Sequence, residues 1–247
     1  MNQFQQVDQL KNQLSSLRPL NKAELKRLRD EFIIETTYNS NAIEGNTLTL
    51  RETALILQEG ITIGEKPIRE HLEVIGFKDA FHYIIELASK DEPLSERIIK
   101  NIHSLVLMND RANRGQYRGV PVQILGANHT PPQPFEIEPR LQQLLADYEV
   151  WKNEKHVIEA IAHFHLEFEA IHPFIDGNGR TGRLLINLEL IKHGYLPVDI
   201  KFTDRRKYYD SFDIYHSDKH NIQGLTDLIT QYELEELKRY IAMIQSK

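Results

Sequence analysis

The sequence predicts an all-α protein that carries one short β-hairpin. In most of the chain, apolar residues recur at three- and four-residue spacings, as they do on one face of an α-helix. The stretch YRGVPVQILGANHTPPQP breaks this rhythm with alternating apolar residues followed by prolines. The 247 residues are 40% apolar and 27% charged, a composition typical of a globular protein with a sizeable core.

The helical pattern divides into successive segments. Residues 22–42 form the first predicted helix, which ends where Gly45 and Asn46 interrupt the pattern. A second helix is expected from about Leu50 and a third over 68–89, with GITIGEKPI between them as a loop of some strand character. The stretch DEPLSERIIKNIHSLVL indicates a capped helix start followed by an apolar stripe. Further helices are expected at about 139–153, 155–171, 180–193, 203–216 and 224–245.

The β-hairpin is expected over residues 117–131. Val120, Val122 and Ile124 alternate along one arm, and a glycine and an asparagine then suit a turn. The prolines that follow prevent a helix there.

The charge balance excludes several classes of protein. The formal net charge is -6, so there is no basic excess to bind nucleic acid or an anionic membrane surface. The chain has no cysteine, which excludes disulfides and cysteine-bound metals and suits a reducing compartment. Its N-terminus is polar, and no apolar run is long enough to cross a bilayer. We therefore expect a cytoplasmic protein.

The stretch HPFIDGNGRTGR, residues 172–183, has the features of an anion-binding turn. It follows a strongly apolar predicted helix, and Pro173 disfavours helical geometry at His172. Gly177 and Gly179 allow positive φ angles and a close approach of the backbone to a ligand. A glycine-rich turn that leads into a helix presents free N–H groups and a partial positive charge.

Charged side chains in the same turn favour a phosphate ligand. Arg180 and Arg183 lie three positions apart, on one helical face, and their forked donors suit phosphate. Asp176 is then a carboxylate among phosphates, a natural ligand for a magnesium ion that bridges phosphate oxygens. His172 is placed to take a proton from an attacking hydroxyl. These residues together predict a site for phosphoryl or nucleotidyl transfer.

The stretch resembles the signature of the Fic family, H-x-F-x-[DE]-G-N-G-R-x-x-R, and meets every specified position. The resemblance extends from about residue 36 to about residue 216. It implies a Fic-type helical domain in which the hairpin is a flap beside the active site. Because the family's enzymes mostly transfer AMP from ATP to a hydroxyl side chain of a protein, it also implies a protein adenylyltransferase that uses magnesium.

The resemblance also implies roles for individual residues. His172 is the catalytic base and Asp176 the magnesium ligand. His216 stands where the family often has asparagine, and Gln123 and His129 of the flap are expected to face the target. The residues expected to contact the nucleotide are Gln123, Ile124, Leu125 and Gly126 of the flap, Asp176, Gly177, Asn178, Gly179, Arg180, Thr181, Gly182 and Arg183 of the signature, and Tyr208 and Tyr209 of RRKYYDSF.

A second stretch, SNAIEGN from Ser40 to Asn46, resembles the family's inhibitory motif, [ST]-x-x-x-E-[GN]. By this resemblance Glu44 pairs with Arg183. A carboxylate there occupies donors that would otherwise hold the γ-phosphate, so ATP is badly placed for in-line attack. We therefore expect a self-inhibited enzyme.

The motifs divide the chain into three expected regions and indicate its partners. Residues 1–92 are expected to carry the inhibitory motif, 93–220 to form the catalytic core with the flap at 117–131, and 221–247 to form a packing helix. The expected partners are ATP and an unidentified target protein, with self-modification as one outcome. Exposed helix faces allow a homo-oligomer.

Three other functions remain open from the sequence. Removal of AMP from a modified protein is permitted by Glu44, which would help to activate water. Phosphotransferase relatives of this fold carry lysine where Gly179 stands, so that glycine favours AMP transfer. A non-catalytic nucleotide-sensing scaffold needs no base, so an intact His172 argues against it. A zinc site at HFH is disfavoured because His163 and His165 point in different directions on a helix.

Overall fold

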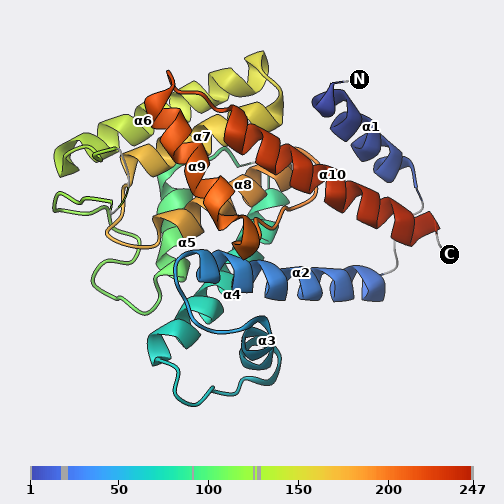
Figure 1. Ribbon diagram of the computed structural model, residues 1–247, viewed down its shortest axis with the longest axis horizontal. Coiled ribbons are helices and arrows are strands. Elements are labelled where there is room, and N and C mark those ends of the chain that lie inside the picture. The colour runs from blue at the N-terminus through green and yellow to red at the C-terminus, as the bar shows by residue number, and fades with distance from the viewer. Residues whose placement is uncertain (1, 18–21, 91, 125, 127–128, 246–247) are drawn as a thin grey trace.

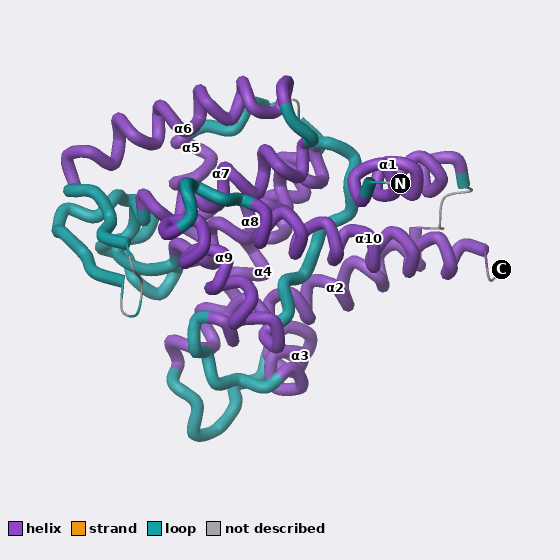
Figure 2. Tube along the Cα trace, turned by 45° about the horizontal axis from the view of Figure 1, so that its top comes forward, coloured by secondary structure: helices purple, strands orange, loops and turns teal. Residues whose placement is uncertain are grey.

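The computed structural model describes residues 2–17, 22–90, 92–124, 126 and 129–245. Within these residues the regular structure is helical, and no strand is assigned (Figures 1 and 2). The all-α prediction is therefore confirmed for the described part of the chain. The elements are α1 (Gln3–Ser16), α2 (Lys22–Ile43), α3 (Leu50–Glu59), α4 (Ile68–Ala88), α5 (Glu96–Val106), α6 (Pro134–Glu154), α7 (Val157–Ile171), α8 (Asn178–Lys192), the 3₁₀-helix η1 (Phe202–Asp204), α9 (Arg205–Ser217) and α10 (Gln223–Gln245).

Helix α8 lies at the centre of the fold and begins at the glycine-rich turn. Almost every residue from Asn178 to Leu190 is buried, including the charged ones. It contacts α2, α4, α5 and α7, and α10 passes across the same bundle (Figure 1). A helix that is enclosed on all sides has little freedom to shift. The turn that leads into α8 is therefore held on a rigid element.

One helix was missed from the sequence, and another begins several residues earlier than predicted. Helix α1 was not predicted because its sequence is polar. Its apolar residue Val7 is nevertheless buried, and the helix packs along α10 near the chain's ends (Figure 1). Helix α6 begins at Pro134 rather than at about 139, because proline at the first helical position loses no hydrogen bond. Pro134 therefore starts a helix, whereas the sequence prediction used the prolines only to exclude one.

The predicted β-hairpin is not present in the described residues of 117–131, so this part of the prediction is wrong. Pro121 interrupts the alternating arm and has no N–H to donate to a partner strand. The Arg118 guanidinium joins the two ends of the loop instead, donating to the carbonyls of Val120 (3.0 Å) and Pro132 (2.7 Å). One side chain thus holds the two ends of the flap together. Residues 125 and 127–128 lie outside the described part.

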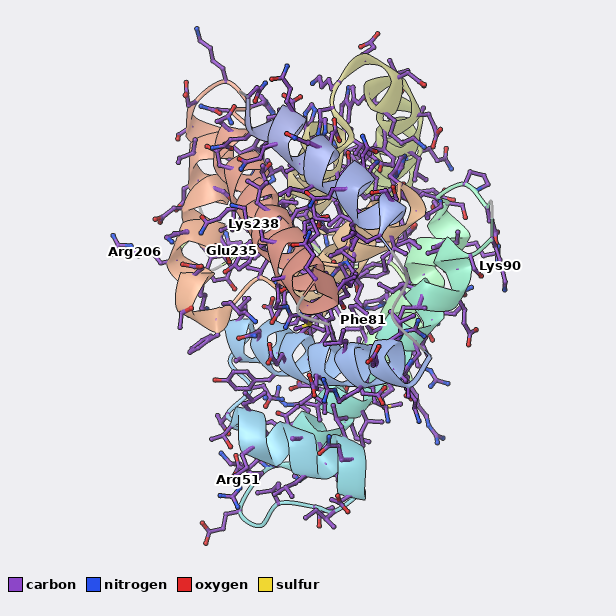
Figure 3. All side chains as sticks on the ribbon, turned by 90° about the vertical axis from the view of Figure 1, so that its right-hand side faces the viewer. Arg51, Phe81, Lys90, Arg206, Glu235 and Lys238 are labelled. Atoms are coloured by element: carbon purple, nitrogen blue, oxygen red, sulfur yellow. The ribbon has the colours of Figure 1, made fainter. Side chains whose placement is uncertain are left out.

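One continuous apolar core joins the two ends of the chain, with buried members from Val7 in α1 to Leu237 in α10. Phe81 of α4 is fully buried in this core, whereas charged side chains such as Arg206 project from the periphery (Figure 3). A smaller cluster of Leu48, Ile56 and Val74 attaches α3 to α4. Among the described helices, none is long and apolar enough to span a membrane.

A buried acid in α10 makes the stability of the fold depend on pH. Glu233 is fully buried and accepts the N–H of Leu196 through Oε1 (3.0 Å), while Oε2 makes no hydrogen bond with the described residues. Burial, assisted by the charge of Glu236, raises the pKa of Glu233 to about 8. Because this folded-state pKa lies above the unfolded value, stability is greatest below the unfolded pKa and falls as pH rises towards 8.

The variant Glu233→Gln keeps the oxygen that accepts the Leu196 N–H but has no charge to bury. We expect it to raise the free energy of unfolding at pH 9 by roughly 1–3 kcal/mol and to flatten the decline between pH 5 and pH 9. Urea unfolding at both pH values measures this. The control Glu235→Gln removes an exposed carboxylate from the same helix (Figure 3). An equal decline in wild type and Glu233→Gln would contradict the assignment.

Candidate active site

His172 caps α7 in a left-handed backbone conformation, with φ 49° and ψ 60°. Few residues other than glycine adopt this conformation, so the surroundings must hold it. Its N–H donates to Phe168 O (3.0 Å), and its carbonyl accepts from Arg118 Nε (2.8 Å). The backbone N–H of Arg118 also donates to Pro173 O (2.9 Å). The flap loop and the end of α7 are therefore held together at the histidine.

The turn after His172 is anchored by a stacked pair of rings. Phe174 is fully buried and stacks on the His103 imidazole, with ring centroids 3.6 Å apart. His103 Nδ1 accepts the Gly115 N–H (2.9 Å), which leaves the Nε2 proton to be donated to Asp176 O (2.9 Å). Burial lowers the pKa of His103 to about 4, so the ring stays neutral and this tautomer is retained.

Asn178 closes the turn, and Gly177 starts the following helix. The Asn178 side chain accepts the N–H of Phe174 and donates to its carbonyl, both at 2.9 Å. Gly177 has φ 79°, and a Cβ there would lie 3.3 Å from a Val106 methyl group. The first hydrogen bond of α8 runs from Thr181 N to Gly177 O (3.0 Å). The N–H groups before it point out of the helix end, as an anion site requires.

Arg183 is buried and donates four hydrogen bonds to acceptors from three segments of the chain. Its Nη2 donates to Glu44 Oε1 and to Ser40 O, both at 2.8 Å. Its Nε donates to Ser40 Oγ (2.9 Å), and its Nη1 to Tyr208 Oη (3.3 Å). Burial works against the charge, but Tyr208 and Glu44 outweigh it and raise the pKa of Arg183. The pairing of Glu44 with Arg183 is thus present in the structure.

Glu44 needs the absence of a side chain at position 179. A Cβ on Gly179 would overlap Glu44 Oε1 and lie 3.0 Å from Arg183 Nη1. Glu44 itself follows the last turn of α2, where its N–H donates to Asn41 O (3.1 Å). The carboxylate therefore reaches the N-terminus of α8 only because a glycine stands there.

Arg180 differs from Arg183 in keeping unused donors. Its Nη2 donates to Asp176 Oδ1 (3.0 Å), and its Nη1 lies 3.6 Å from Glu73 Oε1. Its Nε and Nη1 are buried and make no hydrogen bond with the described residues. Glu73 in turn accepts from Asn46 Nδ2 (2.9 Å), which ties the end of the inhibitory stretch to α4. Arg183 therefore donates four hydrogen bonds, whereas the Nε and Nη1 of Arg180 make none with the described residues.

A cavity of about 480 Å³ opens above this turn, a volume suited to a nucleotide-sized ligand. Its lining comes from the glycine-rich turn and the segments around it, namely Glu44, Glu169, His172, and Asp176 to Gly179. The flap loop contributes Ile124, Gly126 and His129, and α9 contributes Arg205, Tyr208, Tyr209, Phe212, Asp213 and His216. The cavity therefore joins the start of α8 to the flap loop and to α9.

His172 faces this cavity as a neutral base. Burial, reinforced by the charge of Arg118, lowers the pKa of His172 to about 4. Opposing influences come from Glu44, from the Glu169 backbone carbonyl and from Asp176. A neutral imidazole at physiological pH has one unprotonated nitrogen that is able to accept a proton.

The structure brings most of the predicted site residues together, with some differences. Gln123 is exposed, whereas Ile124 and Gly126 line the cavity; Leu125 lies outside the described residues. Arg180, Thr181, Gly182 and Arg183 are buried in α8 and do not line the cavity.

The two tyrosines of α9 differ in exposure. Tyr208 is only 1% exposed, with its hydroxyl bonded to His165 and Arg183, so it offers little surface to a base. Tyr209 is partly exposed, and its ring lies 5.0 Å from the Arg205 guanidinium.

Sequence reasoning missed several residues that position the site. His103, Arg118 and Glu73 lie far along the chain from the signature and match no motif that was considered. Glu169 had a local signal, because it precedes His172 by three positions and so shares its helical face. Phe212 and Asp213 also line the cavity.

Comparisons with known proteins agree with this geometry. The profile of the Fic/DOC family matches residues 93–190. Protein adenylyltransferase Fic of Aedes aegypti is 39% identical over 214 residues, which cover 84% of this chain and 42% of that protein. The protein of the same name from Nematostella vectensis is 37% identical over 208 residues, which cover 83% and 48%. This chain spans less than half the length of these curated relatives.

Solved structures show the same fold. A Fic domain containing signaling protein from Bacteroides thetaiotaomicron superposes with a TM-score of 0.88 at 27% identity, covering 100% of this chain and 98% of that one. Fic-1 (residues 134–508) from C. elegans superposes with a TM-score of 0.83 at 30% identity, covering 99% of this chain and 72% of that one. The chain belongs to the Fic/DOC family.

Proposed function

We propose that the chain is a self-inhibited protein adenylyltransferase, which moves AMP from ATP to a hydroxyl side chain of a target protein. The observation that carries this proposal is a neutral His172 beside a helix N-terminus, in one cavity with Asp176 and Glu44. The names of the curated relatives from Aedes and Nematostella support the same activity. The target remains unidentified, and the chain itself is one candidate.

In the proposed reaction, the target hydroxyl attacks the α-phosphorus of ATP while His172 takes the hydroxyl proton. A bond forms between the target oxygen and the α-phosphorus, and the bond from that phosphorus to the pyrophosphate oxygen breaks. The N–H groups at the start of α8 would bind the negatively charged phosphates. The unused donors of Arg180 add to the same attraction.

Asp176 fits the role of a magnesium ligand. Its side chain is 55% exposed at the cavity, and both hydrogen bonds to the carboxylate use Oδ1, from Gly177 N (2.6 Å) and from Arg180 (3.0 Å). Among the described residues there is no cluster of three or more metal-ligating side chains. Magnesium commonly binds through one carboxylate together with phosphate oxygens and water. When bound, the ion would neutralise phosphate charge.

The Glu44–Arg183 contact supports self-inhibition. The Glu44 carboxylate stands between the α8 N-terminus and the Arg183 guanidinium, where a terminal phosphate of ATP would bind. Two anions cannot share these donors without repulsion. ATP would therefore bind with its phosphates displaced from the in-line geometry.

His172→Ala and His172→Asn are expected to lower transfer by about 10²–10⁴-fold in a Glu44→Gly background, because the base is lost. Asparagine tolerates the left-handed backbone better than alanine, so it controls for local strain. Affinity for ATP should remain largely intact, since the base acts on the hydroxyl. Labelled-AMP transfer and calorimetric ATP titration measure the two quantities. An equal loss of affinity and activity would remove His172 from the chemical step.

Asp176→Asn is expected to weaken magnesium-dependent ATP binding and turnover together. The amide oxygen still accepts from Arg180, so the turn is preserved while one charged metal ligand is lost. Titrations with ATP in the presence and absence of magnesium separate the effects, and binding without the metal should change little. Unchanged metal dependence in this variant would argue that Asp176 does not hold the ion.

Glu44→Gly is expected to raise AMP transfer by about ten- to a hundred-fold, which corresponds to about 1.4–2.8 kcal/mol of released competition. Arg183→Ala should not mimic it, because the phosphates then lose the same arginine. The double variant should resemble Arg183→Ala alone, as expected of partners in direct contact. Incorporation of AMP from α-labelled and phosphate from γ-labelled ATP distinguishes adenylyl from phosphoryl transfer. Equal labelling by wild type and Glu44→Gly would reject self-inhibition.

A further inference from the structure

A buried carboxyl stands beside the catalytic base and has no part in the reaction described so far. Glu169 lies one turn before His172 on α7 and lines the same cavity. Its Oε2 is 3.9 Å from His172 Nδ1. His172 Nδ1 is buried, and the Glu169 backbone carbonyl is the acceptor that acts on it. Glu169 Oε1 is buried and makes no hydrogen bond with the described residues. Buried polar groups are rarely left unpaired, so this carboxyl requires an explanation.

A neutral histidine acts as a base through one nitrogen only, and the partner of the other nitrogen decides which one. A carboxylate beside Nδ1 accepts a hydrogen bond from the Nδ1–H group. The imidazole then keeps its proton on Nδ1, and Nε2 is free to take a proton from the substrate. A protonated carboxyl favours the opposite tautomer, because it donates to Nδ1. The ionisation of Glu169 is therefore coupled to the tautomer of His172.

We propose that Glu169 is a positioning residue for the His172 imidazole, an inference that rests on the proposed function. As a carboxylate it holds the proton of His172 on Nδ1 and leaves Nε2 as the base that faces the target hydroxyl. It does not touch the substrate, and it acts only through the imidazole.

The space for this carboxyl depends on a glycine in the next helix. A Cβ on Gly182 would lie 2.8 Å from Glu169 Oε1 and 2.8 Å from His165 Nδ1. Tyr208 accepts from Arg183 (3.3 Å), so its own proton goes to His165 Nε2 (2.8 Å) and His165 carries its proton on Nδ1. His165 Nδ1 and Glu169 Oε1 both border the space that Gly182 leaves open, so a carboxylate there would lie beside an imidazole N–H.

The charges around Glu169 come from every side of the pocket. Glu44 faces it from the end of α2, Arg183 from α8, Tyr208 from α9 and His165 from α7 itself. Burial, assisted by the negative charge of Glu44, raises the pKa of Glu169 to about 8, against the influence of Arg183. Removing Glu44 leaves the Arg183 charge unshared and should lower this pKa. The inhibitory glutamate thereby also keeps Glu169 protonated.

The pH dependence of AMP transfer shows which ionisable group controls the activity. Arg118 and burial hold the pKa of His172 near 4, and Asp176 and Glu44 oppose them. A rise in activity between pH 6 and pH 9 therefore belongs to Glu169 and not to the histidine. The parameter kcat/KM for ATP reports the free enzyme, in which no phosphate charge is present.

The first experiment reads the tautomer directly, by ¹⁵N NMR of the ATP-free Glu44→Gly protein, with His172→Asn used to assign the signals. At pH 8.5 we expect His172 to carry its proton on Nδ1. In Glu44→Gly/Glu169→Gln this preference should be lost. The Glu169 backbone carbonyl, an alternative acceptor, is retained in that variant, so the comparison isolates the side chain. Glutamine has the same shape and is neutral, as the buried carboxyl is in the inhibited state, so it should fold.

The second experiment measures kinetics in the same background. Glu169→Gln should lower kcat at pH 8.5 by about ten-fold or more, leave KM for ATP within about two-fold, and abolish the rise between pH 6 and pH 9. The control Glu167→Gln removes a carboxylate of α7 that does not line the cavity, and it should keep the rise. In addition, the rise in activity should occur at higher pH in wild type than in Glu44→Gly, because Glu44 raises the pKa of Glu169.

An unchanged tautomer together with an unchanged pH profile in Glu169→Gln would overturn the proposal. A loss of activity with the tautomer and the pH dependence intact would also overturn it, because it would indicate a structural role. If no variant transfers AMP, the proposed function is rejected, while the NMR comparison still decides whether Glu169 controls His172.

Discussion

The buried Arg183 guanidinium is the interaction on which the rest of the site depends. A buried charge is tolerated only when its donors are satisfied, and its removal would leave several acceptors unpaired. Arg183 donates to Ser40, Glu44 and Tyr208, which come from α2, from the segment after it and from α9. One side chain of the central helix thus holds the stretch from Ser40 to Glu44 and α9, which lines the cavity, in place.

His172 is held in a similar way, through its backbone rather than through its ring. Arg118 binds carbonyls at the end of α7 and on both sides of the flap, including those of His172 and Val120. The left-handed conformation of His172 and the closed shape of the flap therefore have one common cause. Phe174 and His103 add a stack of two rings beneath the turn, which supports the backbone after His172.

The two arginines of the signature differ in how many of their donors are paired within the protein. Arg183 donates four hydrogen bonds within the protein, one of them to Glu44. Arg180 is equally buried but keeps donors that make no hydrogen bond with the described residues, with Glu73 and Asp176 as its anionic neighbours. The site thus combines a well-paired cation with one that is only partly paired. The difference arises from the neighbours, because the two residues are chemically identical.

The sequence by itself determined most of the helices and the glycine-rich turn between α7 and α8, because both depend on local patterns. Apolar spacing placed α2, α4, α7 and α8 close to their observed ends, and the order of histidine, glycine and arginine indicated the turn. The hairpin was predicted wrongly for the same reason. Alternating residues show what one strand would look like, but not whether a partner is available, and Pro121 removes a donor from the arm.

Tertiary structure alone decided which distant groups meet at the site. Glu44 and Arg183 are 139 positions apart, and Arg118 and His172 are 54 apart, so no local periodicity connects them. The resemblance to a family suggested the first pair; nothing in the sequence suggested the second. The charge around Glu169 likewise depends on α2, α8 and α9 meeting at one point. Burial and neighbouring charge set the ionisation of a residue, and both are properties of the packed molecule.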